Sequence, residues 1–442
     1  MSATSFLRRL LGGGAGGVDR RISDLASLCE ALLAEPGEYA STALARQALA
    51  AYRALDERLR TEFFGVLAQD YSPAPEAVAH AVAAYQADPS AEQLMALQAA
   101  VETPRQKLFR RFNMAPDGTA TLVAMRGALL KDLKAHPEWR PIEWDLMHLL
   151  RSWFNRGFLR LQRIDWRTSA IVLEKLIQYE AVHAIHGWRD LRRRLEADRR
   201  CFAFFHPQLP DEPIIFIEVA LVRGMSAQVQ PLLDVASPVA PPAEADCAVF
   251  YSITNCQEGL RGISFGNQLI KQVAEDLKRE FPHLRRFATL SPVPGFRRWL
   301  EKSRVRVSMG SGGDERLALL ARLADPAWHL GEIPEALEKL LTRLCAWYLL
   351  HARQDGEPLD PVARFHLGNG AALERINWMG DSSEQGMSRS AGMMVNYVYW
   401  LADVERNHER YFREHHIAAS PQVEKLAREG AAAAQADKGA AG

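Results

Sequence analysis

A strand, a glycine-rich bend and a helix follow one another between Cys247 and Phe281, and this succession constrains the fold most. The run Cys247–Thr254 (CAVFYSIT) is apolar, β-branched and aromatic, which predicts a buried strand. Apolar residues then recur at helical spacing as far as Phe281: Leu269, Ile270, Val273 and Leu277. Three glycines lie between the two elements: Gly259, Gly262 and Gly266. Glycines let the backbone approach a phosphate, and a helix N-terminus stabilises its charge, so the stretch predicts either an anion cradle or a plain turn.

Length and charge narrow the class of protein. At 442 residues the chain exceeds the usual size of a single core, so we expect two domains. Lysine plus arginine equals aspartate plus glutamate at 54 each, which argues against binding nucleic acid through overall charge. No run approaches the roughly 20 apolar residues that span a bilayer, so we expect no membrane span. Neither terminus carries an export or peroxisomal signal, which favours a soluble cytoplasmic protein. The arginine-bearing, acid-poor segment Met1–Arg21 fits either an organelle transit peptide or a flexible N-terminus.

The first third of the chain has the pattern of a helical bundle. Apolar residues recur at helical spacing from Ile22 to Leu32, and prolines punctuate the later segments: Pro36, Pro73, Pro89 and Pro104. We therefore expect a flexible N-terminus over residues 1–20 and an all-α oligomerisation domain over 21–153. No cluster of residues in this region looks chemical.

Strands appear after Leu159, which predicts an α+β two-domain protein. Strand-like runs cover Cys201–Phe205 and Ile214–Val222, and the turn-forming residues Pro210–Pro213 predict a hairpin loop between them. We expect a catalytic α/β domain over residues 154–427 and a low-complexity tail over 428–442. Composition alone gives only a mixed α/β domain.

Four segments downstream of the glycine-rich bend occur in a fixed order: Ser291-Pro-Val-Pro-Gly-Phe, Phe365-His-Leu-Gly-Asn-Gly, Arg375-Ile-Asn-Trp-Met-Gly-Asp and Val395-Asn-Tyr-Val-Tyr. Together with the bend they resemble the malonyl-CoA decarboxylase family, from about Glu180 to about Val423 and more weakly through the N-terminal third. The resemblance implies a helical domain that assembles dimers or tetramers and a GNAT-like α/β domain that binds acyl-CoA. It also implies a carboxy-lyase that converts malonyl-CoA to acetyl-CoA and CO2 in fatty-acid metabolism.

The resemblance assigns acyl-CoA contact to the bend itself: Arg261, Gly262, Ile263, Ser264, Phe265, Gly266 and Asn267. Ser264 stands where a standard GNAT phosphate loop keeps its first glycine. Some family members place a carboxylate there, so a catalytic carboxylate at this position cannot be carried over to this chain.

Ser291 and His366 are the two catalytic residues that the resemblance implies, and both would contact malonyl-CoA. On local sequence alone Ser291 is a turn or capping serine, because no Gly-x-Ser-x-Gly elbow surrounds it. His366 lies beside apolar residues in a strand-like or loop setting, which is typical of a core histidine. The following Gly-Asn-Gly run nevertheless permits close approach of a ligand, and imidazole suits proton transfer.

Three further residues are candidates for the site. By resemblance, Tyr399 lies near the active site and orients His366 through its hydroxyl, although it also fits a stripe of core aromatic residues. Asn377 belongs to one of the ordered segments. Lys175 matches a family lysine, whereas on its own it has the pattern of an exposed helical lysine.

We expect neither a metal nor a cofactor. The pairs His183-x-x-His186 and His415-His416 lack a third ligand at suitable spacing, and the five cysteines form no CxxC pair. Loss of CO2 from malonyl-CoA leaves a thioester enolate, which needs no electron sink. Two other functions stay open: a GNAT-type N-acetyltransferase that shares the cradle, and a non-catalytic acyl-CoA-binding scaffold.

Overall fold

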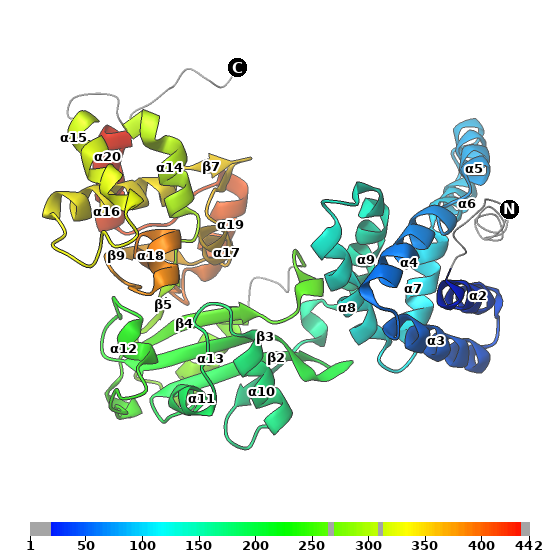
Figure 1. Cartoon of the computed structure of the whole chain (residues 1–442), viewed down its shortest axis with the longest axis horizontal. Helices are drawn as coiled ribbons and strands as arrows, with labels where there is room; N and C mark the ends of the chain where they lie inside the picture. The colour runs from blue at the N-terminus through cyan, green and yellow to red at the C-terminus, as the bar shows by residue number, and fades with distance from the viewer. Residues whose placement is uncertain (1–18, 264–268, 308–312, 435–442) are drawn as a thin grey trace. The chain divides into compact units, whose positions relative to one another are not determined.

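The computed structural model describes residues 19–263, 269–307 and 313–434 (Figure 1). Its Cα positions divide the chain into two compact units. The first comprises Met1–Arg160, Phe204–Ile214 and Asn255–Phe265, and the second comprises Leu161–Ala203, Ile215–Thr254 and Gly266–Gly442. The first segment of the bend therefore clusters with the helical part of the chain.

The first unit is built mainly from antiparallel and crossing helices. Their bounds are α2 (Arg20–Ala34), α3 (Glu38–Arg53), α4 (Glu57–Asp70), α5 (Pro75–Ala87), α6 (Ala91–Val101), α7 (Pro104–Met114), α8 (Gly118–Asp132) and α9 (Arg140–Trp153). Several begin as the sequence dictates: Asp56, Ser90 and Thr103 each accept a backbone N–H at a helix start, and proline occupies the first turn of α7. The expected helical bundle is confirmed.

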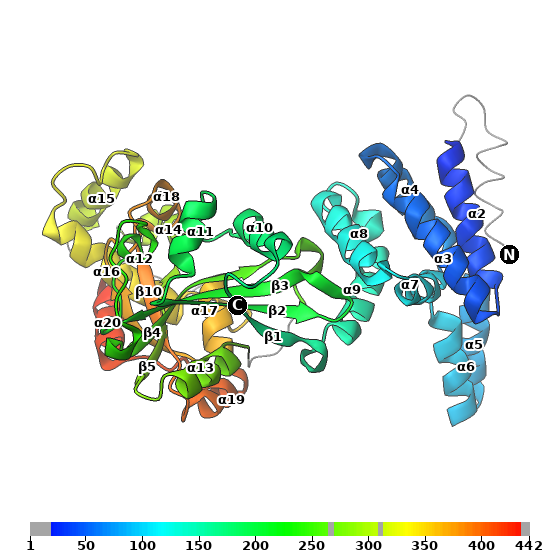
Figure 2. The same cartoon turned by 90° about the horizontal axis from the view of Figure 1, so that it is seen from below.

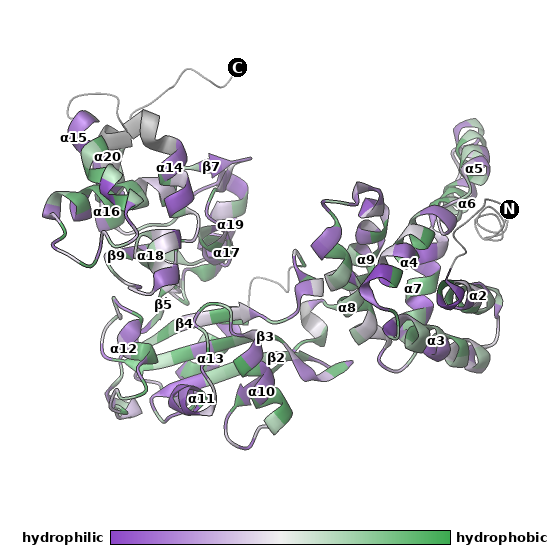
Figure 3. Ribbon diagram, viewed as in Figure 1, coloured by the Kyte–Doolittle hydropathy of each residue, from purple (hydrophilic) through white to green (hydrophobic). Residues whose placement is uncertain are grey.

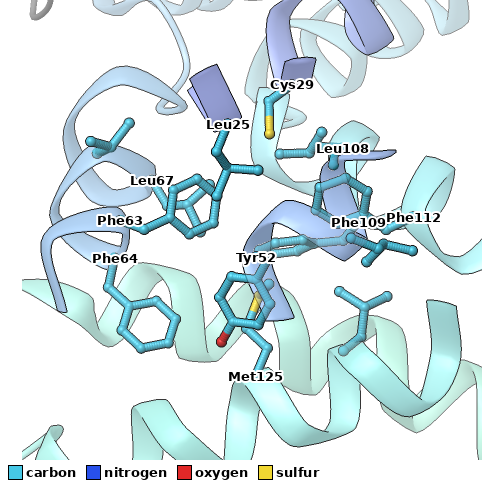
Figure 4. Packing of buried hydrophobic residues seen from close by; sticks show 14 of the residues in the cluster. Leu25, Cys29, Tyr52, Phe63, Phe64, Leu67, Leu108, Phe109, Phe112 and Met125 are labelled. Carbon is cyan, nitrogen blue, oxygen red and sulfur yellow. The ribbon is translucent and has the colours of Figure 1, made fainter. Parts of the chain in front are cut away.

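The core of this unit gathers mostly aromatic and aliphatic side chains from α2, α3, α4, α7, α8 and α9, and Figure 4 shows part of it. The residues labelled there are Leu25, Cys29, Tyr52, Phe63, Phe64, Leu67, Leu108, Phe109, Phe112 and Met125. Full burial of a Leu, Phe or Met side chain stabilises the folded state by about 1.5–3 kcal/mol relative to leaving it exposed. One ion pair lies among them: the Arg105 Nε lies 2.9 Å from the Asp145 carboxylate, with Thr103 donating to the same oxygen. By contrast, α6 buries none of its side chains.

A mixed sheet has the strand order β1-β2-β3-β4-β5-β10-β6, and β9 also pairs with β10. Most of its residues belong to the second unit, whereas Arg160, Phe204–Ile214 and Asn255 are counted with the first. The strand bounds are β1 (Arg160–Ile164), β2 (Arg199–His206), β3 (Leu209–Val222), β4 (Cys247–Asn255), β5 (Arg286–Thr289), β6 (Ser291–Pro292), β9 (Ala372–Asn377) and β10 (Met394–Val398). Strands β4 and β5 are parallel, whereas β10 runs antiparallel to β5, β6 and β9. A separate pair joins β7 (Arg353–Gln354) to β8 (Glu357–Pro358).

Helices cover both faces of this sheet. The bounds are α10 (Ala170–Tyr179), α11 (Trp188–Arg194), α12 (Gln230–Leu233), α13 (Leu269–Glu280), α14 (Phe296–Val307), α15 (Gly313–Ala321), α16 (Glu335–His351), α17 (Pro361–Gly368), α18 (Glu384–Ser390), α19 (Val404–Glu414) and α20 (Pro421–Ala434). Figures 1 and 2 show α10 and α11 on one face and α13 on the other. Short 3-10 turns cover Pro137–Trp139, Arg156–Phe158, Pro242–Glu244, Glu258–Leu260 and Arg322–Ala324.

Buried strands at the centre of the sheet account for the apolar runs in the sequence. Hydrophobic residues predominate along β3 and β4, whereas hydrophilic residues mark the outer sides of the helices (Figure 3). The predicted strand and helix on either side of the bend are confirmed as β4 and α13. Within the described residues, no helix combines the length and the apolarity that crossing a membrane requires.

Two local predictions about the sheet and its helices were wrong. The residues Pro210–Pro213 lie inside β3, and the turn between β2 and β3 is formed by Pro207 and Gln208. The sequence pattern over Ala170–Ala184 predicts one helix, whereas α10 ends at Tyr179. The Glu180 carboxylate accepts the backbone N–H groups of Val182 and His183, at 2.7 and 2.9 Å, in a turn that replaces the last part of the predicted helix.

Candidate active site

Ser291 and His366 meet although they lie 75 positions apart in the sequence. Ser291 opens β6, where its backbone pairs with Val395 on β10. His366 lies in the last turn of α17, a helix that begins at the Asp360 cap, so the strand or loop expected there was wrong. The Ser291 Oγ atom lies 3.0 Å from the His366 Nε2 atom. Both side chains are buried, with 6% and 3% of their surface exposed.

Two tyrosines from β10 and its C-terminal end fix the imidazole. The Tyr399 hydroxyl lies 2.8 Å from the His366 Nδ1 atom, and the Tyr399 backbone N–H donates to the Phe287 carbonyl oxygen. The Tyr397 ring stacks on the imidazole with centroids 4.7 Å apart and an interplanar angle of 25°. Both ring nitrogens therefore have hydroxyl partners, and one face of the ring is packed.

The hydrogen bonds among Tyr399, His366, Ser291 and Thr289 can all donate in the same direction, from Tyr399 towards Thr289. The Ser291 hydroxyl donates to the Thr289 Oγ1 atom at 2.9 Å, so its oxygen is available to accept from the His366 Nε2–H group. The Nδ1 atom then accepts from the Tyr399 hydroxyl. This arrangement selects the neutral Nε2–H tautomer and aims a proton of His366 at Ser291.

Burial keeps the imidazole of His366 and the hydroxyls of Tyr397 and Tyr399 uncharged at neutral pH. It lowers the pKa of His366 to about 3, because a charged imidazolium would lose its hydration with no carboxylate to compensate. Burial also raises the pKa of the Tyr397 and Tyr399 hydroxyls well above their ordinary value. Among the described partners of Ser291 and His366, the hydrogen-bond donors are neutral and none is a carboxylate.

A second set of hydrogen bonds supports the strand that carries Ser291. The Asn377 side chain donates to the Asn396 carboxamide oxygen at 2.9 Å, and the Asn396 amide donates to the Thr289 carbonyl oxygen at 2.7 Å. Asn377 therefore reaches Ser291 only through Asn396 and Thr289. Sequence reasoning missed Thr289, although a residue two positions before Ser291 on a strand points to the same face.

A side chain of α8 holds the backbone of the described part of the bend, which ends at Ile263. Gly262 has φ +79°, a left-handed conformation that favours glycine. The buried Arg126 guanidinium of α8 donates to the carbonyl oxygens of Gly259 at 2.6 Å and Arg261 at 2.9 Å, and it pairs with Glu143. Arg126 was not expected to serve the bend, because neither its neighbours nor its spacing distinguishes it from other helical arginines.

The other residues that the sequence singled out for the site are Ile263–Asn267 and Lys175. Ile263 is buried, whereas Ser264, Phe265, Gly266 and Asn267 lie outside the described residues. Lys175 is half-buried on α10 and is not among the partners of Ser291 or His366 given above. Within the described residues, no group of three or more His, Cys, Asp and Glu side chains could hold a metal ion. The five cysteines are buried and form no disulfide with one another.

Comparisons with known proteins agree along most of the chain. The family model described as malonyl-CoA decarboxylase C-terminal domain matches residues 157–437, and that of the N-terminal domain matches residues 71–154. A protein of Anser anser anser named malonyl-CoA decarboxylase, mitochondrial, is 38% identical over 406 residues, covering 84% of this chain and 81% of its own length.

Solved structures give the same result. A crystal structure of malonyl-CoA decarboxylase from Rhodopseudomonas palustris is 49% identical with a TM-score of 0.88, covering 91% of this chain and 99% of that chain. That of the Agrobacterium vitis protein is 47% identical with a TM-score of 0.85 and the same coverage of both chains. The chain belongs to the malonyl-CoA decarboxylase family.

Proposed function

We propose that this protein converts malonyl-CoA to acetyl-CoA and CO2, with Ser291 and His366 as the catalytic residues. The observation that carries the proposal is the hydrogen-bonded chain from Tyr399 through His366 to Ser291, in a member of a family named for this reaction. Neutral donors held in a buried place suit a reaction that develops negative charge on a thioester oxygen.

The chemistry follows from the substrate. The carboxylate of malonyl-CoA is β to a thioester carbonyl. When the bond to the carboxylate carbon breaks, CO2 leaves and the electron pair moves into a thioester enolate. The enolate oxygen then needs stabilisation, and the α-carbon needs one proton to become the methyl group of acetyl-CoA.

Ser291 and His366 can supply both needs. Each carries one proton, on Oγ and on Nε2, which is donated to Thr289 and to Ser291 in the structure and would turn to the substrate when malonyl-CoA is bound. A donor aimed at a developing oxyanion contributes on the order of 3 kcal/mol. The direction of the hydrogen bonds favours His366 as the proton donor to carbon, because the Tyr399 hydroxyl can hand its own proton to Nδ1 as the Nε2 proton leaves. Ser291 then holds the enolate oxygen. Because Tyr399 is buried, the proton that restores its hydroxyl comes back through His366 once acetyl-CoA has left.

The bend supplies positioning. We propose that Arg261–Asn267 bind the diphosphate of CoA, which is remote from the bond that breaks. Binding energy from such a remote part fixes the malonyl end against the reacting groups. The positive φ of Gly262 and the clamp of Arg126 on the carbonyl oxygens support this role.

We further propose that the protein acts in the cytoplasm, in fatty-acid metabolism, as a homodimer or homotetramer assembled through the helical unit. Exposed apolar side chains support this assembly, because Leu94, Met95 and Val101 of α6 expose 41%, 68% and 46% of their surface. The goose relative is named mitochondrial, so fractionation of cells that express the full chain tests the compartment.

Release of CO2 by the purified protein tests the function. With malonyl-CoA as the only substrate, we expect CO2 and acetyl-CoA in equal amounts. An N-acetyltransferase would be inactive until an amine is added, and a binding scaffold would bind malonyl-CoA without turnover. Either result would contradict the proposal.

A further inference from the structure

A basic cavity lies beside the loop that carries Ser291 and has no part in the mechanism above. It has a volume of about 550 Å³, within the range of about 300–1,000 Å³ typical of small-molecule sites. Its wall includes Gly295, four positions after Ser291 on the same proline-rich loop, and Pro361 at the start of α17. Ser291 and His366 do not line it.

Three cations line this cavity: Arg298 and Lys302 of α14 and Arg389 of α18. All three are exposed, and within the described part of the chain none forms an ion pair. Among the described residues that line the cavity, none carries a carboxylate. The first turn of α14 also begins at this wall, and the positive end of its dipole adds to the field of the side chains. The cavity is therefore electrostatically suited to an anion.

One wall of the cavity is aromatic and preorganised. The Trp299 ring lies in an aromatic cluster, with its centroid 5.6 Å from that of Trp347 and 5.2 Å from that of Tyr348. Gly295 permits this packing, because a Cβ atom there would come within 2.3 Å of the Tyr348 hydroxyl oxygen. Trp299 is partly exposed and lines the cavity, so a flat base can lie against a ring whose orientation is already fixed.

Asp360 lies between the lining residues Leu359 and Pro361 in sequence but does not itself line the cavity, and its carboxylate is already engaged. The Asp360 carboxylate accepts backbone N–H groups from Gly295, Val362 and Ala363 at 3.0–3.3 Å, as the N-cap of α17. It therefore does not compete with a ligand for the three cations.

From these observations we infer that the cavity binds a phosphorylated nucleotide, with the phosphate on Arg298, Lys302 and Arg389 and the base against Trp299. This inference goes beyond the proposed function and in part rests on it, because such a nucleotide has two possible sources. It is either the 3′-phosphorylated adenosine end of the CoA thioester or a separate nucleotide that binds beside the catalytic loop.

The double variant Arg298→Gln/Lys302→Gln tests the cavity with little risk to folding, because both side chains are exposed. Arg413→Gln/Lys425→Gln is the matched control: it removes two exposed cations of the same unit that do not line the cavity. The Michaelis constant is measured with malonyl-CoA and with malonyl-dephospho-CoA, which lacks the 3′-phosphate. Binding of adenosine 3′,5′-bisphosphate is measured by calorimetry in the presence and absence of acetyl-CoA.

If the substrate supplies the nucleotide, the double variant raises KM for malonyl-CoA about tenfold, as expected when charged hydrogen bonds to a phosphate are lost, and leaves KM for the dephospho substrate unchanged. If the nucleotide is separate, the bisphosphate binds even with saturating acetyl-CoA, and the double variant loses that binding with KM unchanged. Unchanged KM together with unchanged or absent bisphosphate binding would overturn the inference. The calorimetric result stands even if the protein lacks decarboxylase activity.

Discussion

His366 shows how burial sets the chemistry available to one residue. An imidazole at its ordinary pKa would be partly charged near neutral pH, whereas here burial lowers the pKa to about 3. The protein therefore presents a neutral donor whose orientation is fixed by Tyr399, Ser291 and the Tyr397 ring. A neutral donor avoids trapping the substrate carboxylate in a salt bridge with the catalytic group.

The lowered pKa predicts how stability depends on pH. Between pH 6.5 and about 3 the unfolded chain binds a proton at His366 and the folded chain does not, so stability falls as pH falls through this window. His366→Gln removes this effect. From pH 6.5 to pH 4 we expect the unfolding free energy of the variant to improve relative to the wild type by about 3 kcal/mol. Denaturant titrations at several pH values measure it, and a difference that does not vary with pH would contradict the lowered pKa.

Thr289 is a positioning residue for Ser291. Its hydroxyl oxygen accepts from both the Ser291 hydroxyl and the Tyr397 backbone N–H, at 2.9 and 3.2 Å. We expect Thr289→Val to lower kcat about tenfold, because the serine proton loses its direction, while KM for malonyl-CoA stays within about twofold. Thr289→Ser keeps the hydroxyl and should restore kcat. Equal losses in both variants would mean that Thr289 matters only for packing.

At the scale of elements, the sequence was informative where the pattern is local. The apolar run of β4 and the helical period of α13 are complete within their own segments. The turn after β2 was misplaced because proline is tolerated near the start of a strand, where Pro210 lies. The helix around His366 was missed, although Asp360 followed by proline is a standard helix start.

The clamp of α8 on the bend makes a prediction about binding. Arg126→Lys keeps the charge, but an ammonium cannot reach two carbonyl oxygens and Glu143 with the same geometry. We expect KM for malonyl-CoA to rise about tenfold with kcat within about twofold, because the bend loses its support. Lys131→Gln, at an exposed position of the same helix, is the control. A fall in kcat with unchanged KM would assign Arg126 a different role.

At the scale of the whole molecule, the first unit holds the described part of the bend that we propose to bind CoA, and the second unit holds Ser291 and His366. The sequence predicted a helical domain and an α/β domain, and both are present. It could not place Ser291 beside His366 from local patterns, because their contact depends on the pairing of β6 with β10 and on the packing of α17. Only the family resemblance indicated that these two segments act together.

Assembly through the helical unit is a prediction at this scale. Met95→Glu places a charge on the exposed apolar side of α6, and burying it in an interface between copies is costly. We expect light scattering to show a smaller assembly than the wild type. Glu92→Lys, which changes a charge on the same helix without removing an apolar side chain, is the control. An unchanged mass for Met95→Glu would exclude α6 from the interface.

The most direct test of the account is the steady-state decarboxylation of malonyl-CoA by Ser291→Ala and His366→Ala. The account predicts that kcat falls at least a hundredfold in each variant, by the order of magnitude expected for lost oxyanion donors, while the Kd of acetyl-CoA changes less than about threefold. Near-normal turnover in both variants would contradict it.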